Sequence, residues 1–114
     1  MSLVTRPAPD FTKPAILPNG SFEDNYNLHS HIRDKYAVLF FYPLDFTFVC
    51  PSEIIAHSPR AKEFQQRNVE VIGISVDSQF THHAWRNTPI TQGGIGPIDL
   101  TLVADLGGEI MTAY

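Results

Sequence analysis

The chain has 114 residues, of which 43% are hydrophobic and 18% charged, the balance of a water-soluble globular domain rather than of a disordered or fibrous segment. Its 8 basic and 12 acidic residues give a formal net charge of −4, and its apolar runs are far shorter than a membrane span. We therefore expect no nucleic-acid partner and no membrane partner, because the first needs basic patches and the second a long apolar segment.

The first 36 residues predict an N-terminal β-hairpin. This stretch is polar and contains four prolines, which disfavour long helices and long strand ladders. Two short segments, 15–17 and 21–23, flank the sequence Pro18-Asn19-Gly20. Asn-Gly between such segments is a strong signal for a tight turn that joins two antiparallel strands.

Two apolar runs predict the centre of a sheet. Residues 37–42 (AVLFFY) and 69–76 (VEVIGISV) are rich in β-forming side chains, as is typical of strands buried on both faces. The residues between the runs have helical periodicity, which gives a strand–helix–strand unit with parallel strands and a right-handed crossover. We expect the first of these strands at the centre of the sheet. Within the helical segment, Ser58 followed by Pro59 predicts an N-cap and a restart of the helix.

The last third of the chain predicts three further elements. Residues 80–85 are expected to form a short helix, and residues 87–97 a loop, because they contain three glycines and two prolines. A short strand is expected over residues 100–103. A helix is expected to start at Glu109 and to be cut short by the end of the chain.

Cys50 is the leading candidate for a reactive residue. It follows the carboxyl end of the first predicted central strand, where open α/β sheets bind their ligands. Pro51 and Glu53 have the composition of a first helical turn, and a helix N-terminus favours the thiolate over the thiol. The hydroxyl of Thr47 can bind the sulfur or an incoming oxygen, and Pro43 would exclude water. The alternative is that Cys50 is an inert core residue.

A single cysteine also limits the chemistry. Cys50 has no partner for an internal disulfide, so a redox reaction must be completed by another molecule. The absence of a secretory signal pattern and of paired cysteines predicts a cytoplasmic location. We expect no metal at the histidine pairs 29/31 and 82/83, because a zinc site needs about four ligands. His82, Tyr42 and Trp85 are interpreted as packing residues.

The motifs around Cys50 resemble those of a known family. Pro43, Thr47 and Cys50 form the pattern P-x-x-x-T-x-x-C inside FYPLDFTFVCPSEII, and VIGISVD, Ala84-Trp85 and GGIGP follow in order. In these motifs the chain resembles the peroxiredoxins, in particular the typical two-cysteine branch that includes the alkyl hydroperoxide reductase C proteins. The resemblance covers nearly the whole chain. It implies a thioredoxin-like α/β fold, with a central mixed sheet and flanking helices.

The resemblance also implies a function and a set of site residues. The chain would be a thiol-dependent peroxidase that reduces hydrogen peroxide and organic hydroperoxides. Cys50 would attack the peroxide and become a sulfenic acid, while Thr47 orients the peroxide, Pro43 shields the sulfur and Glu53 supports an arginine. No cofactor is implied. The implied partners are a thioredoxin-like or flavoprotein disulfide reductase, and further copies of the chain in a homodimer and a ring.

Several family features lie beyond the last residue of this sequence. The active-site arginine, the resolving cysteine, and the C-terminal strands and helix of the family have no counterpart in it, so residues 1–114 are expected to form a single, incomplete domain. Arg86 does not occupy the arginine motif, and Glu53 can equally be a first-turn carboxylate that favours the helix dipole. The alternatives are a weakly active or non-catalytic fragment, a one-cysteine peroxidase resolved by an external thiol, and a holdase-type interaction module.

Overall fold

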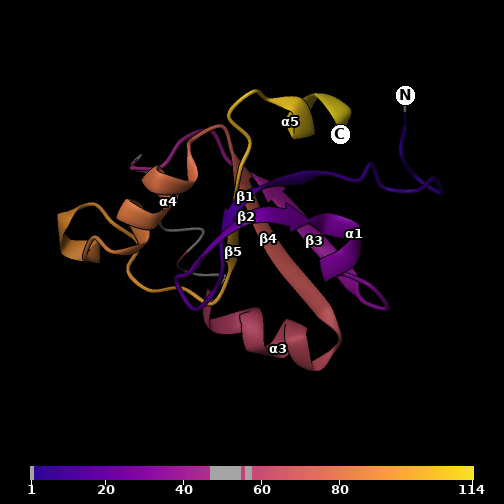
Figure 1. The fold of residues 1–114 in the computed structure, drawn as a ribbon. Coiled ribbons are helices and arrows are strands. Elements are labelled where there is room, and N and C mark those ends of the chain that lie inside the picture. Colours follow the sequence, from indigo (N-terminus) through magenta and orange to yellow (C-terminus); the bar gives the residue numbers. More distant parts are fainter. Residues whose placement is uncertain (1, 47–54, 56–57) are drawn as a thin grey trace.

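The computed structural model describes residues 2–46, 55 and 58–114, and these form one mixed five-stranded sheet with helices around it (Figure 1). No helix in the described part of the chain is both long and apolar enough to cross a bilayer. The elements, in chain order, are β1 Thr12–Ile16, β2 Phe22–Asn27, α1 Leu28–His31, β3 Tyr36–Phe41, the 3₁₀ helix η1 Ser58–Arg60, α3 Ala61–Gln66, β4 Val69–Ser75, α4 Gln79–Arg86, the 3₁₀ helix η2 Ile90–Gln92, β5 Thr101–Ala104 and α5 Glu109–Ala113.

The strand order in the sheet is β2-β1-β5-β4-β3. β3 and β4 are parallel, as are β4 and β5, whereas β1 is antiparallel to both of its neighbours. The predicted N-terminal hairpin is confirmed: Ile16 pairs with Phe22, and Gly20 takes the left-handed conformation, with φ of 87°, that the turn requires. A register shift between Lys13 and Ala15 accommodates Pro14 inside β1.

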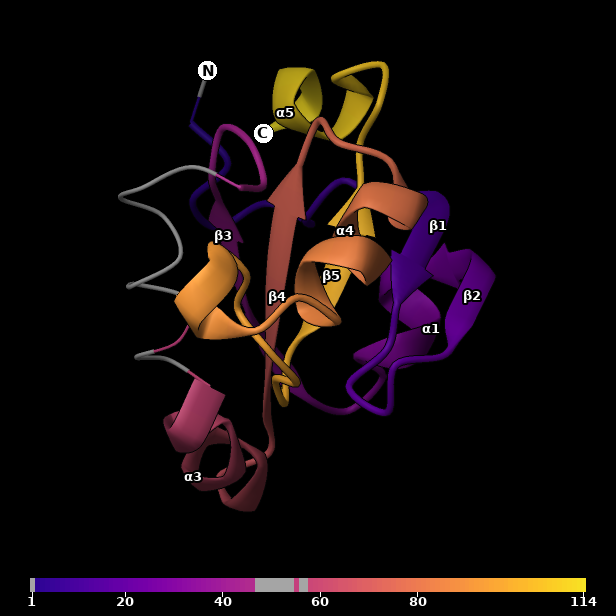
Figure 2. The same cartoon turned by 90° about the vertical axis from the view of Figure 1, so that its left-hand side faces the viewer.

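Each face of the sheet carries its own apolar core, because successive side chains of a strand point to opposite faces. One core gathers around Trp85 of α4 and includes Leu102 of β5. The other includes Val103, the next residue of β5, with Leu28 of α1 and Ile110 of α5. Figure 2 shows α4 in front of the sheet and α1 behind it. The sheet is therefore covered on both faces, which explains why β5 is buried along its whole length.

The expectation of a central strand at residues 37–42 is wrong. β3 lies at one edge of the sheet that the described residues form, and its Tyr36, Val38 and Phe41 are exposed. A continuous apolar run predicts a strand, but it does not reveal how many neighbours the strand has. The central position is taken instead by β5, which pairs on one side with β1 and on the other with β4.

Ser58 and Pro59, the predicted N-cap and first helical residue, open η1, which is followed directly by α3. The Ser58 hydroxyl accepts a hydrogen bond from the backbone N–H of Asp99 (2.9 Å), and α3 has Arg60 at its N-cap with no side-chain cap. The predicted kink or restart before Ser58 stays a prediction. Residues 54, 56 and 57 of this segment lie outside the described residues. The helix at 80–85, the strand at 100–103 and the helix at 109 are confirmed within two residues as α4, β5 and α5. The loop at 87–97 contains the short helix η2, and α1 was not predicted.

The apolar edge of β3 predicts self-association of residues 1–114. An exposed apolar edge strand is a template for pairing with another chain, and a lysine on such an edge opposes that pairing. Sedimentation velocity of the 114-residue chain should therefore show association that increases with concentration, and Val38→Lys should shift the distribution toward monomer.

The control variant is Gln66→Lys, which adds the same charge at an exposed position of α3. It should leave the association unchanged. A wild-type chain that sediments as a monomer at every concentration would contradict the prediction.

Candidate functional site

The structure describes one of the four site residues expected from the sequence. Pro43 follows β3, and its side chain is exposed. Thr47, Cys50 and Glu53 lie outside the described residues, so their roles stay predictions. The described part of the site therefore consists of residues 42–46 and the side chains in contact with them.

An open apolar hollow lies beside Pro43. It has a volume of about 530 Å³ and opens at the carboxyl ends of β3 and β4, the end of a parallel sheet at which ligands bind. Asp105 and Ser75 contribute polar groups to a lining that is otherwise apolar. Asp105 is occupied, because its carboxylate accepts the backbone N–H groups of Ile110 (3.1 Å) and Met111 (3.0 Å) at the start of α5. The lining residues are Phe41, Tyr42, Pro43, Leu44, Ile74, Ser75, Val76, Asp105 and Met111.

A buried polar cluster of Tyr42, Asp45 and His82 joins the chain after β3 to helix α4. The Tyr42 hydroxyl donates to Oδ1 of Asp45 at 2.8 Å, and Nδ1 of His82 lies 2.6 Å from Oδ2 of the same carboxyl group. The side chains of Asp45 and His82 have no exposed surface. Buried polar groups of this kind persist only when they are hydrogen-bonded to one another.

Both ring nitrogens of His82 face acceptors. Nε2 lies 3.0 Å from the carbonyl oxygen of Val103, which can only accept, so Nε2 carries a proton. Nδ1 faces the Asp45 carboxyl group, and a second proton lies between these two groups. Both ring nitrogens therefore have a hydrogen-bond partner, as a buried polar ring requires.

Tyr42 is a fixed donor in this cluster. Its backbone N–H donates to the Ile74 carbonyl (3.1 Å) and so extends the ladder between β3 and β4 by one residue. Burial, and then the neighbouring Asp45 carboxylate, raise the pKa of the Tyr42 hydroxyl far above its usual value. The hydroxyl stays protonated and keeps donating to Asp45. Tyr42 also packs on Trp85, so the expectation of a packing role is confirmed, but it omitted the hydrogen bond.

Sequence analysis missed Asp45 as a site residue and the pairing with His82. Asp45 lies inside the P-x-x-x-T-x-x-C segment, where an acidic residue in a loop is expected to be exposed. His82 occurs 37 residues later. The signal that could have found it is the spacing on α4: His82 and Trp85 are three residues apart, so both lie on the buried face of that helix.

Removal of Asp45 should cost much of the stability of the chain. Asp45→Ala leaves a buried imidazole without its partner, so we expect the free energy of unfolding to fall by about 3–5 kcal/mol. The double variant Asp45→Ala/His82→Leu should regain part of this loss, because it leaves no buried ionisable group. Urea unfolding followed by circular dichroism measures both. Equal losses in the single and double variants would contradict the coupling of the two side chains.

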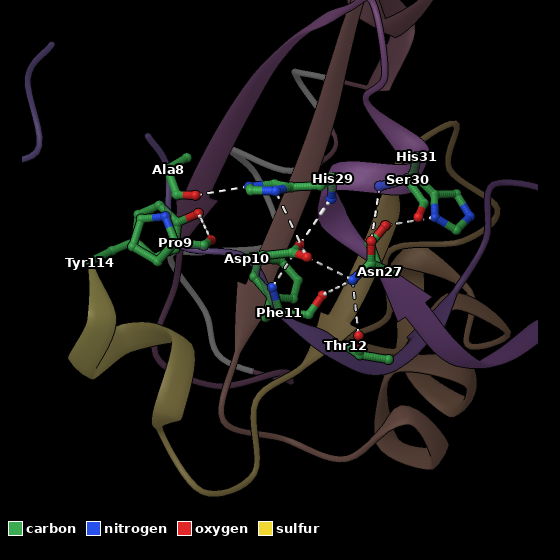
Figure 3. A network of polar contacts seen from close by, with 10 residues as sticks. All are labelled: Ala8, Pro9, Asp10, Phe11, Thr12, Asn27, His29, Ser30, His31 and Tyr114. Carbon is green, nitrogen blue, oxygen red and sulfur yellow. Dashed lines mark hydrogen bonds and ion pairs between the residues drawn. The ribbon is translucent and has the colours of Figure 1, made fainter. Parts of the chain in front are cut away.

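A second polar cluster lies around Asp10 (Figure 3). Oδ1 of Asp10 accepts the backbone N–H groups of Phe11 (2.9 Å) and His29 (3.0 Å), and Oδ2 accepts Nδ2 of Asn27 (3.0 Å). Nε2 of His29 donates to the carbonyl of Ala8 at 2.8 Å. These bonds tie the segment before β1 to the start of α1. The side chains of Asp10 and His29 are half exposed and bound to neighbouring protein groups, so the cluster is structural.

The segment before β1 is also bound to Tyr114, the last residue of the sequence. The Tyr114 hydroxyl donates to the carbonyl of Pro9 at 2.5 Å, and its ring contacts Phe41 of β3. Figure 3 shows Tyr114 reaching from the end of α5 to the N-terminal segment. Residues far apart in the sequence are thereby held together next to the end of β3.

The hydrogen bonds to the Asp10 carboxylate predict that the stability of the chain depends on pH. Slight burial by itself raises the pKa of the Asp10 carboxyl group, but the hydrogen bonds from Asn27, His29 and Phe11 outweigh it and hold the pKa below its usual range. The stabilisation is therefore complete above the unfolded-state pKa of about 3.9 and is lost as the pH falls through the lower folded-state pKa. Wild type should be more stable than Asp10→Asn near neutral pH, and the two urea midpoints should converge in acid. A constant difference between them would contradict this.

Comparisons with known proteins place the chain among relatives of one kind. Residues 4–114 match the AhpC/TSA family. The chain is 51% identical over 114 residues to the alkyl hydroperoxide reductase C of Buchnera aphidicola subsp. Baizongia pistaciae, and 58% identical over 113 residues to peroxiredoxin-1 of Gallus gallus. These alignments span 100% and 99% of this chain, but only 57% of the length of the first relative and 56% of the length of the second.

A solved structure shares the fold. The reduced 2-Cys peroxiredoxin of Plasmodium vivax superposes with a TM-score of 0.94 at 48% identity, over 100% of this chain and 58% of that one. This likeness confirms the thioredoxin-like fold expected from the sequence. The chain spans a little over half the length of the relatives that it matches.

Proposed function

Because the chain belongs to the AhpC/TSA family, we propose that the protein is a thiol-dependent peroxidase that reduces hydrogen peroxide and organic hydroperoxides at Cys50. The observation that carries this proposal is the P-x-x-x-T-x-x-C segment of Pro43, Thr47 and Cys50, which begins at the carboxyl end of β3 in a chain about half identical to alkyl hydroperoxide reductase C. Residues 1–114 are proposed to be part of a single domain.

The proposed reaction is a two-electron reduction of the peroxide. The Cys50 thiolate attacks one peroxide oxygen, the S–O bond forms as the O–O bond breaks, and the leaving oxygen takes a proton to give water or an alcohol. Cys50 becomes a sulfenic acid. A second thiol then condenses with it, releasing water and forming a disulfide, and a dithiol partner reduces that disulfide.

Three neighbours of Cys50 have proposed roles in the first step. Thr47 binds and orients the peroxide, Pro43 shields the sulfur from water, and Glu53 supports an arginine supplied from outside residues 1–114. The apolar hollow beside Pro43 supports the inclusion of organic hydroperoxides, because an alkyl group gains free energy when it leaves water for an apolar surface.

The proposed partners are a disulfide reductase and further copies of the chain. The reductase is a thioredoxin-like protein or a flavoprotein, which would act in the cytoplasm. Phe80 on α4 and Phe22 on β2 support assembly into dimers and rings, because both are exposed and their rings lie 5.7 Å apart in one apolar patch. A related peroxiredoxin from Plasmodium yoelii, modified at its N-terminus, is described as an artifactual octamer.

Substitution of Cys50 and Thr47 in the complete protein tests the proposed reaction. Cys50→Ser should abolish peroxide consumption, because a serine hydroxyl is not ionised at neutral pH. Thr47→Val should slow it by about 10²-fold, because one hydrogen bond to the reacting oxygens is lost, whereas Thr47→Ser should stay near wild type. Stopped-flow measurement with hydrogen peroxide gives all three rates.

The same variants separate the peroxidase from the alternative holdase function. If Cys50→Ser protects an aggregating client as well as wild type does, and wild type consumes no peroxide, the protein is an interaction module. Peroxide consumption by Cys50→Ser at the wild-type rate would contradict the role of the thiol.

A further inference from the structure

Asp45 ties the segment from Pro43 to Phe46 to three elements of the fold. Tyr42, at the end of β3, donates to Oδ1, and His82 of α4 binds Oδ2. The backbone N–H of Asp45 donates to Oδ2 of Asp77, just after β4, at 2.6 Å. These contacts fix the position and the direction of the chain at Asp45.

His82 connects that residue to the interior of the sheet. Its Nε2 donates to the carbonyl of Val103 in β5, and its own helix is started by Ser78, whose hydroxyl accepts the backbone N–H of Thr81 at 3.1 Å. One imidazole ring therefore spans from a buried central strand to the chain that follows β3. Figure 2 shows α4, the helix that carries His82, in front of the sheet.

Phe46, the residue after Asp45, has a strained backbone conformation. Phe46 has φ of 58°, in the left-handed region that a bulky side chain seldom adopts, and its ring lies 6.1 Å from that of Trp85. Such a conformation persists only where the surroundings over-determine it, and it concentrates at functional sites. Cys50, the proposed reacting residue, follows Phe46 by four positions in the sequence.

The chemistry of the pair favours orientation over stability. A buried ionisable pair often stabilises a protein no better than two apolar side chains of the same volume would. A pair of hydrogen bonds between fixed groups does, however, specify one geometry, and small displacements of a reacting group lower a rate steeply. The side chains of Asp45 and His82 have no exposed surface, so the pair is of this buried kind.

We propose that His82 is a positioning residue for peroxide reduction: through its contact with Asp45 it orients residues 43–46, which include Pro43 of the proposed site and precede Cys50 in the sequence. This inference rests on the proposed function. His82 does not act on the peroxide itself, since both of its ring nitrogens are occupied by Asp45 and Val103.

Two substitutions of His82 separate its two contacts. In His82→Asn the side-chain amide replaces Nδ1 and can still donate to Asp45, but the contact with Val103 is lost. In His82→Gln the amide replaces Nε2 and can still donate to Val103, but the contact with Asp45 is lost. His83→Gln, on the next residue of the same helix, is the matched control.

Each variant of the complete protein is measured in three ways. These are the rate constant for peroxide reduction by stopped flow, the pH profile of Cys50 alkylation by mass spectrometry of its peptide, and urea unfolding. His82→Gln should lower the peroxide rate about tenfold or more and shift the alkylation profile, whereas His82→Asn should stay within about threefold of wild type. His83→Gln should match wild type in both. Equal peroxide rates in the two His82 variants, or rates that follow only their unfolding midpoints, would overturn the proposal.

A second pair of variants covers the case in which His82→Gln fails to fold. Asp45→Asn keeps an acceptor for Tyr42 and a donor for Nδ1 of a neutral His82 ring, so it should retain the Cys50 alkylation profile, whereas Asp45→Ala should change it. Identical profiles would overturn the proposal. If wild type itself consumes no peroxide, the proposed function fails, but the alkylation profiles still decide whether His82 orients the segment.

Discussion

The hydrogen-bonded pair of Asp45 and His82 links the segment after β3, where the proposed site begins, to helix α4, which packs in an apolar core. On one side of the contact is the segment that leaves β3; on the other is α4, whose Trp85 lies at the centre of one of the two apolar cores. Because both side chains are buried, neither can exchange its partner for water without exposing the core. The position of Asp45 therefore depends on how α4 packs against the sheet.

The remainder of the fold fixes α4 and the ends of β3 and β4 relative to each other. β4 is parallel to β3 and to β5, so the carboxyl ends of these strands meet at the edge where Pro43 and the apolar hollow lie. The hairpin of β1 and β2 adds the strands on the other side of β5. The N-terminal segment is tied by Asp10 and Tyr114 to α1 and to the end of α5, so it lies against the same end of the molecule.

Local patterns in the sequence predicted the local structure well. The Asn-Gly turn and the apolar run at 69–76 each predicted the right element, because turn chemistry and β-forming side chains act within a few residues. The central place of β5 and the edge place of β3 could not be predicted in this way, since strand order depends on pairing between distant segments. The same limit applied to Asp45 and His82, which are 37 residues apart and meet only because α4 folds across the sheet.

For the site itself, the sequence supplied the motif and the structure supplied its support. Pro43 is at the predicted place after β3, while Thr47, Cys50 and Glu53 remain expectations that follow from the resemblance. The apolar hollow and the pairing of Asp45 with His82 are properties of three-dimensional packing. The spacing on α4 indicates only that His82 lies on the buried face of that helix.

The most direct test of this account is to trap the oxidised state of Cys50. One equivalent of hydrogen peroxide is added to the complete, reduced protein together with a nucleophile that reacts only with sulfenic acids, and the peptides are analysed by mass spectrometry. The account predicts a single adduct, on Cys50, formed before any methionine is oxidised. Full consumption of the peroxide with an unmodified Cys50 thiol, or an adduct confined to another residue, would contradict it.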